Sequence, residues 1–273
     1  MTADRSDQHP HIPDGPVPSS EEGRRLLELV KVMARLRGPN GCPWDREQTH
    51  ETLARHLLEE SHELLEAIDR GDSDAIRDEL GDLLLQVVFH AQMAADDDRW
   101  DVDAVARGLV EKLVHRHPHV FGDVEVSGSE EVLTNWEKLK AEERSAPRAA
   151  VDDDIPATLP ALARAAKVQR RAAGWGFEWR TSEAAMAALR EEVEELASAA
   201  SPDDVEEEIG DVLFSTVALA RKLGVDAETA LRRTIRAFSE RYERAMASAS
   251  ERGLDVASMG DEELRQLFRG ARG

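Results

Sequence analysis

The chain has 273 residues and a formal net charge of −21, with 56 acidic against 35 basic side chains. Nucleic acids and anionic membranes are bound through clustered basic residues, so we expect neither as a partner. The sequence also has no apolar run of transmembrane length and no signal-peptide core. Its one cysteine cannot form an internal disulfide, which fits a reducing compartment. Together these features predict a cytoplasmic protein.

The chain order predicts two helical domains. Residues 1–20 carry four prolines and no hydrophobic periodicity, which predicts a disordered tail. Helical periodicity then occupies two long stretches, which we assign to an N-terminal domain at 21–122 and a C-terminal domain at 161–273. Residues 123–160 form a linker with one amphipathic helix, at 130–144. Aromatic residues make up only 4% of the chain, and Ala, Leu, Glu and Arg are abundant. We therefore predict an all-α fold of two tandem helical bundles.

An acidic pattern occurs once in each predicted domain. It has the form E-E-x-x-E, a gap, and then E-x-x-D with glycine before the aspartate. Its members are Glu59, Glu60, Glu63, Glu79 and Asp82 in the first domain, and Glu191, Glu192, Glu195, Glu208 and Asp211 in the second. Positions three or four apart share a helical face, so each half projects its carboxylates in one direction. The offsets 191 − 59 = 132 and 211 − 82 = 129 indicate an internal duplication.

Turn signals between the two halves predict a helical hairpin in each domain. Arg70-Gly71 is typical of a helix C-terminus and Asp72 or Ser73 of an N-cap, while Ser201-Pro202 begins the corresponding second helix. Glu63 and Glu79 are each about 10 Å from their turn at about 1.5 Å per residue, so antiparallel helices bring them to the same height. The second helix of each hairpin is apolar on most faces, which predicts burial. Buried carboxylates are costly unless they are paired or bind a metal.

The ligand chemistry indicates a hard divalent cation. All candidate ligands are carboxylates, which suit Mg²⁺, with Mn²⁺ as the alternative, rather than zinc. His50-Glu51 and His62-Glu63 lack the second histidine of H-E-x-x-H, and neither copy has the E-x-x-H of a di-iron bundle. Bound Mg²⁺ is usually completed by phosphate oxygens, which points to a phosphate-bearing substrate. The alternative is a non-catalytic helical scaffold whose acidic patches bind only cations or partner proteins.

Further motifs carry a family resemblance. They are Gly41-Cys42-Pro43-Trp44-Asp45, Leu58-Glu59-Glu60, Glu79-Leu80-Gly81-Asp82 and Arg116-His117-Pro118-His119-Val120-Phe121. With them, the chain from about residue 21 onward resembles the MazG nucleoside triphosphate pyrophosphohydrolases. The resemblance implies tandem MazG-type domains of the all-α NTP pyrophosphatase architecture and a homodimer. It also implies magnesium-dependent hydrolysis of nucleoside triphosphates, ribo or deoxy, to monophosphate and pyrophosphate, a nucleotide-pool house-cleaning reaction. Related helical phosphohydrolases specific for dUTP or phosphoribosyl-ATP are a narrower alternative.

We interpret all ten carboxylates of the acidic pattern as candidate metal ligands. In metal-assisted hydrolysis at the α-phosphorus, a carboxylate that is not needed as a ligand takes the proton of the attacking water as general base. The first or second glutamate of each E-E-x-x-E is the candidate for this role. These residues are Glu59, Glu60, Glu191 and Glu192.

The resemblance further implies substrate-binding residues. Lys112 and Arg116 are four apart on one helical face and correspond to a lysine and an arginine that the family places against the triphosphate. Arg241 matches Arg116, but Ala237 stands at the matching lysine position, with Arg233 or Arg236, about one turn away, as the alternative cation. Phe268 aligns with a family tryptophan that stacks on the nucleotide, and it lacks the indole N–H. The C-terminal site thus keeps its metal ligands while losing part of its substrate contacts.

Overall fold

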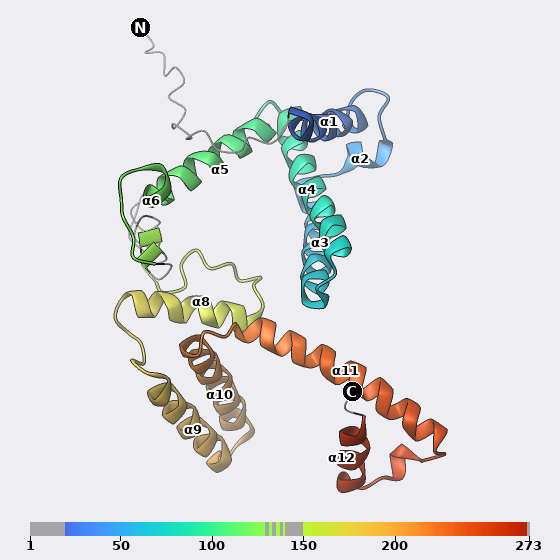
Figure 1. Ribbon diagram of the computed structural model, residues 1–273, viewed down its shortest axis with the longest axis vertical. Coiled ribbons are helices and arrows are strands. Elements are labelled where there is room, and N and C mark those ends of the chain that lie inside the picture. The colour runs from blue at the N-terminus through green and yellow to red at the C-terminus, as the bar shows by residue number, and fades with distance from the viewer. Residues whose placement is uncertain (1–19, 129–130, 133–134, 137–138, 140–149, 272–273) are drawn as a thin grey trace. The chain divides into compact units, whose positions relative to one another are not determined.

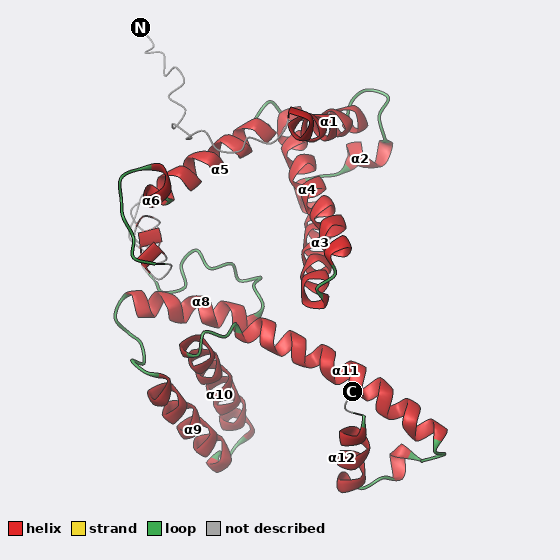
Figure 2. Ribbon diagram, in the orientation of Figure 1, coloured by secondary structure: helices red, strands yellow, loops and turns green. Residues whose placement is uncertain are grey.

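The computed structural model describes residues 20–128, 131–132, 135–136, 139 and 150–271. Residues 1–19 of the predicted tail and most of the predicted helix at 130–144 lie outside them. Within the described residues all regular structure is helical (Figure 2), which confirms the all-α prediction. None of these described helices combines the length and apolar character needed to cross a membrane. The chain divides into two compact units, Met1–Ser145 and Ala146–Gly273.

The first unit contains the hairpin of the first acidic pattern (Figure 1). Its described helices are α1 (Ser20–Arg37), α2 (Pro43–Glu47), α3 (His50–Arg70), α4 (Ser73–Asp96), α5 (Val102–Arg116) and α6 (Pro118–Phe121). Helices α3 and α4 pack along each other. Gly71 ends α3 in the left-handed conformation, with φ of 69°, and the Asp72 side chain caps α4 by accepting from two backbone N–H groups. The first predicted hairpin and its capping residues are confirmed.

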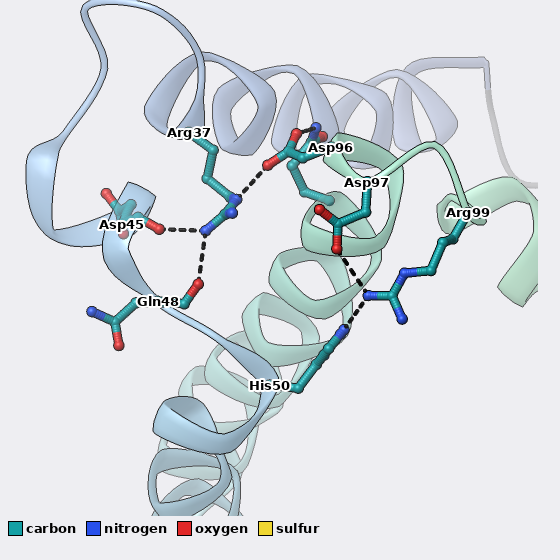
Figure 3. Close-up of polar contacts among 8 residues, drawn as sticks. Arg37, Asp45, Gln48, His50, Asp96, Asp97 and Arg99 are labelled. Carbon is teal, nitrogen blue, oxygen red and sulfur yellow. Dashed lines mark hydrogen bonds and ion pairs between the residues drawn. The ribbon is translucent and has the colours of Figure 1, made fainter.

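An apolar cluster and one arginine anchor this hairpin to α1. The buried members of the cluster are Met33, Leu53, Val88, Phe89 and Met93, from α1, α3 and α4. Arg37, the last residue of α1, has its Nε 2.7 Å from Oδ2 of Asp96 at the end of α4. Its Nη1 donates to the carbonyl oxygens of Asp45 and Gln48 (Figure 3). One guanidinium therefore joins α1 to α4 and to the segment that leads into α3.

The second unit repeats the hairpin. Its described elements are α8 (Ala161–Gly174), α9 (Ser182–Ser198), α10 (Pro202–Lys222), α11 (Ala227–Glu251), the 3₁₀ helix η1 (Val256–Ser258) and α12 (Asp261–Gly270). Ser201 caps α10 in a reciprocal capping box with Asp204, and Pro202 occupies the first turn. The second predicted hairpin is confirmed. Helix α8 packs on α10, where Gln169 donates its Nε2–H to the carbonyl of Phe214 over 2.8 Å.

The helices that carry the E-x-x-D segments are less buried than the sequence predicted. Leu80, Leu84 and Val87 of α4 are exposed, and so are Ile209 and Leu213 of α10. The prediction of burial on most faces was wrong for a single chain, because the helices that pack on α4 and α10 leave one stripe of each uncovered. Leu80 and Leu84 match Ile209 and Leu213 through the offset of 129 residues, so both hairpins expose the same apolar stripe.

Candidate active site

The first hairpin brings three carboxylates together from two helices. Glu60 of α3 and Glu79 and Asp82 of α4 each offer an oxygen within 4.8 Å of the other two. Glu79 and Asp82 are three residues apart, so they share the face of α4 that meets α3. Glu60 and Glu79 are half-buried, whereas Asp82 is exposed. The cluster is therefore fixed by the hairpin interior and open to solvent on the aspartate side.

The second hairpin reproduces this cluster. Glu192 of α9 and Glu208 and Asp211 of α10 have carboxylate oxygens within 4.8 Å of one another, again with two half-buried glutamates and an exposed aspartate. The Oε2 atom of Glu208 is buried and has no hydrogen-bond partner among the described residues. A buried oxygen of this kind is costly unless another group satisfies it.

Burial and neighbouring negative charges raise the pKa values of two carboxyl groups in the first cluster. Burial raises the pKa of Glu60, and the charges of Asp82, Glu63 and Glu79 raise it further. Burial likewise raises the pKa of Glu79, with additional contributions from Glu63 and Asp82. Both effects disfavour the ionised form, so the carboxylates repel one another when no cation is present. Glu63 thus acts on the cluster although it is not one of the three convergent carboxylates.

The second cluster has the same electrostatic character. Burial raises the pKa of Glu208, and Glu195, Asp211 and Glu192 raise it further. Like charges, an all-oxygen donor set and an unsatisfied buried oxygen together fit a hard divalent cation. The residues present therefore fit the cofactor class that the sequence predicted. Glu195 holds the place in this cluster that Glu63 holds in the first.

The first glutamate of each E-E-x-x-E segment lies outside these clusters. Glu59 is exposed, and its Oε2 lies 3.1 Å from Nδ1 of His56 on the same helix. Glu191 is also exposed. Adjacent residues on a helix point in directions about 100° apart, so when Glu60 and Glu192 face the neighbouring helix their predecessors do not.

The predicted phosphate-binding residues of the first unit lie farther along the chain. Asp82 is separated from the end of α4 by 96 − 82 = 14 residues, which is roughly 21 Å of helix. Helix α5, which carries Lys112 and Arg116, follows from that end and packs against α4 and α6. The Arg116 guanidinium lies 5.4 Å from the ring centroid of Trp136. Figure 1 shows α5 leaving the α1 end of α4 without returning along the α3–α4 hairpin, so a single chain does not place this basic pair within the carboxylate cluster.

In the second unit the two predicted substrate-binding residues contact each other. The Arg241 guanidinium lies 3.9 Å from the ring centroid of Phe268, and its Nε donates to the Phe268 carbonyl over 2.5 Å. Phe238 packs against the same ring, with centroids 5.2 Å apart. This pairing joins α11 to α12. Arg241 is the fifteenth residue of α11, well beyond the end of the acidic hairpin.

One departure noted in the sequence, and two residues that were not singled out, acquire a structural context. Asp204 completes the cap of α10. Ala237 is exposed on α11 and offers no charge. Ser215 is buried and donates its hydroxyl to Oε1 of Glu192 over 3.3 Å. Its position, four residues after Asp211 on the same helical face, was the available signal.

The paired hairpins and their carboxylate clusters match a known family. The model described as the MazG nucleotide pyrophosphohydrolase domain matches residues 48–121 and 180–246, and each match contains one complete acidic pattern. The chain belongs to the MazG family.

Relatives extend the MazG match over most of the chain. A nucleoside triphosphate pyrophosphohydrolase of Escherichia coli K12 is 45% identical over 253 residues, covering 90% of this chain and 96% of its own. A nucleoside triphosphate pyrophosphohydrolase/pyrophosphatase MazG of Thermotoga maritima is 42% identical over 253 residues, covering 93% and 98%. A nucleoside triphosphate pyrophosphohydrolase of Mycobacterium tuberculosis is 38% identical over 252 residues, covering 92% and 65%.

Proposed function

We propose that this MazG protein is a magnesium-dependent pyrophosphohydrolase that converts nucleoside triphosphates, ribo or deoxy, to monophosphate and pyrophosphate. The observation that carries the proposal is the convergence of Glu, Glu and Asp from two helices, made twice in one chain. The relatives that match nearly end to end are named for this reaction. Its role is the removal of unwanted nucleotides from the pool.

We assign metal binding to the convergent carboxylates. The ligands are Glu60, Glu79 and Asp82 in the first unit and Glu192, Glu208 and Asp211 in the second. Glu63 and Glu195 are close enough to shift the proton affinity of these clusters, and we assign them as additional ligands. When bound, Mg²⁺ would neutralise phosphate charge and lower the pKa of the attacking water.

We assign the general base to Glu59 and Glu191. They are the members of the acidic pattern that neither join the clusters nor shift the pKa of the clustered carboxylates. They are exposed, as are Asp82 and Asp211, so solvent reaches all four side chains. Replacing both with Gln is expected to lower kcat, typically by 10²- to 10⁴-fold for a lost general base, while Mn²⁺ affinity is unchanged. A matching loss of Mn²⁺ affinity would make them ligands instead.

The glycine before each aspartate has no side chain, which would allow a ligand to approach the helix backbone. A Cβ at Gly81 or Gly210 would meet no described atom within 4 Å, so packing of the described residues does not require glycine. Glycine inside a helix costs roughly 0.5–1 kcal/mol relative to alanine. The open space at Gly81 and Gly210 would let a ligand or a second copy approach the helix backbone closely.

We also propose a homodimer. The exposed stripe of Leu80 and Leu84 on α4, and its counterpart of Ile209 and Leu213 on α10, need cover in water. A second copy would also supply another α5, whose Lys112 and Arg116 are remote from the cluster of their own hairpin. We place the dimer in the cytoplasm, because the sole cysteine and the nucleotide substrates fit that compartment.

Product analysis tests the proposed reaction. Purified protein with Mg²⁺ and each nucleoside triphosphate, in water enriched in ¹⁸O, is expected to give monophosphate and pyrophosphate, with the label in the monophosphate. Label in the pyrophosphate would move the attack to the β-phosphorus, and diphosphate with orthophosphate would exclude the assigned reaction. Turnover confined to dUTP or phosphoribosyl-ATP would favour the narrower enzymes. Absence of turnover with all of these would favour the scaffold.

A further inference from the structure

The two carboxylate clusters differ at one buried polar position. Four residues after each aspartate, α4 carries Gln86 and α10 carries Ser215, and the offset of 215 − 86 = 129 equals that between the aspartates. Both side chains are buried, with exposures of 5% and 9%. Residues four apart share a helical face, so each lies one turn from its aspartate on the side of the partner helix. Polar side chains in such a place need hydrogen-bond partners.

Ser215 finds its partner in the cluster itself. Its Oγ–H donates to Oε1 of Glu192 over 3.3 Å, from α10 across to α9. The bond restrains one carboxylate oxygen of Glu192 and leaves the other available. Glu192 also lies within 4.8 Å of Glu208 and Asp211, so the restrained carboxylate is a member of the convergent set.

Gln86 differs from Ser215 in its chemistry. Its Oε1 is buried without a hydrogen-bond partner in the described part of the chain. This oxygen can only accept hydrogen bonds, and Gln86 could donate to a carboxylate only through its amide nitrogen, whereas serine donates through a hydroxyl. The hydroxyl-to-carboxylate bond is thus a feature of the C-terminal cluster, and the duplicated domains have diverged at this position.

We infer that Ser215 is a positioning residue that holds Glu192 in its metal-binding orientation. The inference rests on the proposed metal site of the second unit. A restrained ligand loses less conformational freedom when the cation binds, and outer-shell hydrogen bonds of this kind usually contribute ten- to a hundredfold to metal affinity. We expect a contribution of about tenfold, at the lower end, because the donor is neutral and its hydrogen bond is long.

Direct Mn²⁺ binding to the 273-residue chain, without nucleotide, tests this role. Asp82→Asn is used as background so that binding reports the second cluster. Calorimetry or electron paramagnetic resonance is expected to show about tenfold weaker binding after Ser215→Ala, and near-original binding after Ser215→Thr, which keeps a hydroxyl. The matched control is Thr216→Ala, because the neighbouring Thr216 hydroxyl donates only to the Val212 carbonyl, over 2.7 Å.

Thermal unfolding separates positioning from a structural role. Alanine has a higher helix propensity than serine, so the metal-free Ser215→Ala variant is expected to be as stable as its parent. Unchanged Mn²⁺ affinity in Ser215→Ala, or an equal loss in Thr216→Ala, would overturn the inference. Adding Asp211→Asn to the background must abolish binding at the second cluster. If it does not, the metal site itself is wrong, which distinguishes failure of the proposed function from failure of the Ser215 role.

Discussion

Glu60 of α3 and Asp82 of α4 hold carboxylate oxygens within 4.8 Å of each other across the first hairpin. Two like charges at this separation oppose the packing of the helices that carry them, and burial, followed by the charge of Asp82, raises the pKa of Glu60. The hairpin still brings them together, because other residues form the caps and the apolar cluster that stabilise it. A bound cation would offset this repulsion between the carboxylates.

Glu60→Gln is therefore expected to have opposite effects with and without metal. In EDTA the variant should be more stable than the original protein, because one repelling charge is gone. With Mg²⁺ at about a hundred times its dissociation constant, the free energy of unfolding of the original protein rises by about 2.7 kcal/mol per site. The variant should gain this stabilisation only at the second site. Thermal unfolding measures both. Glu66→Gln, at an exposed residue paired with Arg70 on the same helix, is the control and should change neither.

The same repulsion predicts a pH dependence for the metal-free protein. Burial and neighbouring carboxylates raise the folded-state pKa of Glu60, Glu79 and Glu208 above the ordinary value of 4.5. A raised folded-state pKa gives a stability contribution that is present below the unfolded-state pKa and is lost as pH rises through the folded-state pKa. The excess stability of Glu60→Gln in EDTA should therefore shrink as pH falls from 7 toward 4.5. An excess that grows on acidification would contradict the assigned sign.

Gly210→Ala tests the space beside the second cluster. Space is available for the methyl group and the position is inside a helix, so the variant should be more stable by about 0.5–1 kcal/mol. If the substrate or a second copy approaches the backbone there, kcat/KM should fall despite the gain in stability. Gly23→Ala in α1 is the matched control, since it is also a helical glycine with open space, and it should stabilise without loss of activity. Equal activity of both variants would refute close approach at Gly210.

The exposed stripe predicts the oligomeric state. Light scattering at micromolar concentration should give twice the mass of one chain. Replacing both Leu80 and Leu84 with Gln should shift the mass toward one chain, because these side chains are exposed on α4 and supply apolar contact area. Arg77→Gln on the same helix is the control for a surface change. A single-chain mass for the original protein would rule out the dimer.

Local signals account for what the sequence predicted well. The ends of the hairpin helices are set by hydrogen bonds within a few residues, at Gly71, Asp72 and Ser201. Such local roles can be predicted from the sequence. The spacing of Glu79 and Asp82 fixes a common helical face for the same reason. The convergence of these residues with Glu60 then follows from the length of the two helices on either side of the turn.

Tertiary arrangement accounts for what the sequence could not predict. The exposure of Leu84 depends on how many neighbours cover α4, which periodicity does not specify. The contact of Arg241 with Phe268 depends on how α12 returns to α11. Whether Glu60 or Glu59 joins the cluster depends on the rotation of α3 about its axis. The sequence does not specify this rotation, so it could not distinguish the two adjacent glutamates.

The most direct test of the account is the rate of pyrophosphate release by Asp82→Asn, Asp211→Asn and the double variant, each shown by circular dichroism to be folded. These changes keep the side-chain shape and remove a charge from one cluster or both. We predict that the double variant has no measurable activity with Mg²⁺, whereas each single variant reports the contribution of the remaining cluster. Full activity in the double variant would mean that neither carboxylate cluster catalyses hydrolysis, and it would contradict the central claim.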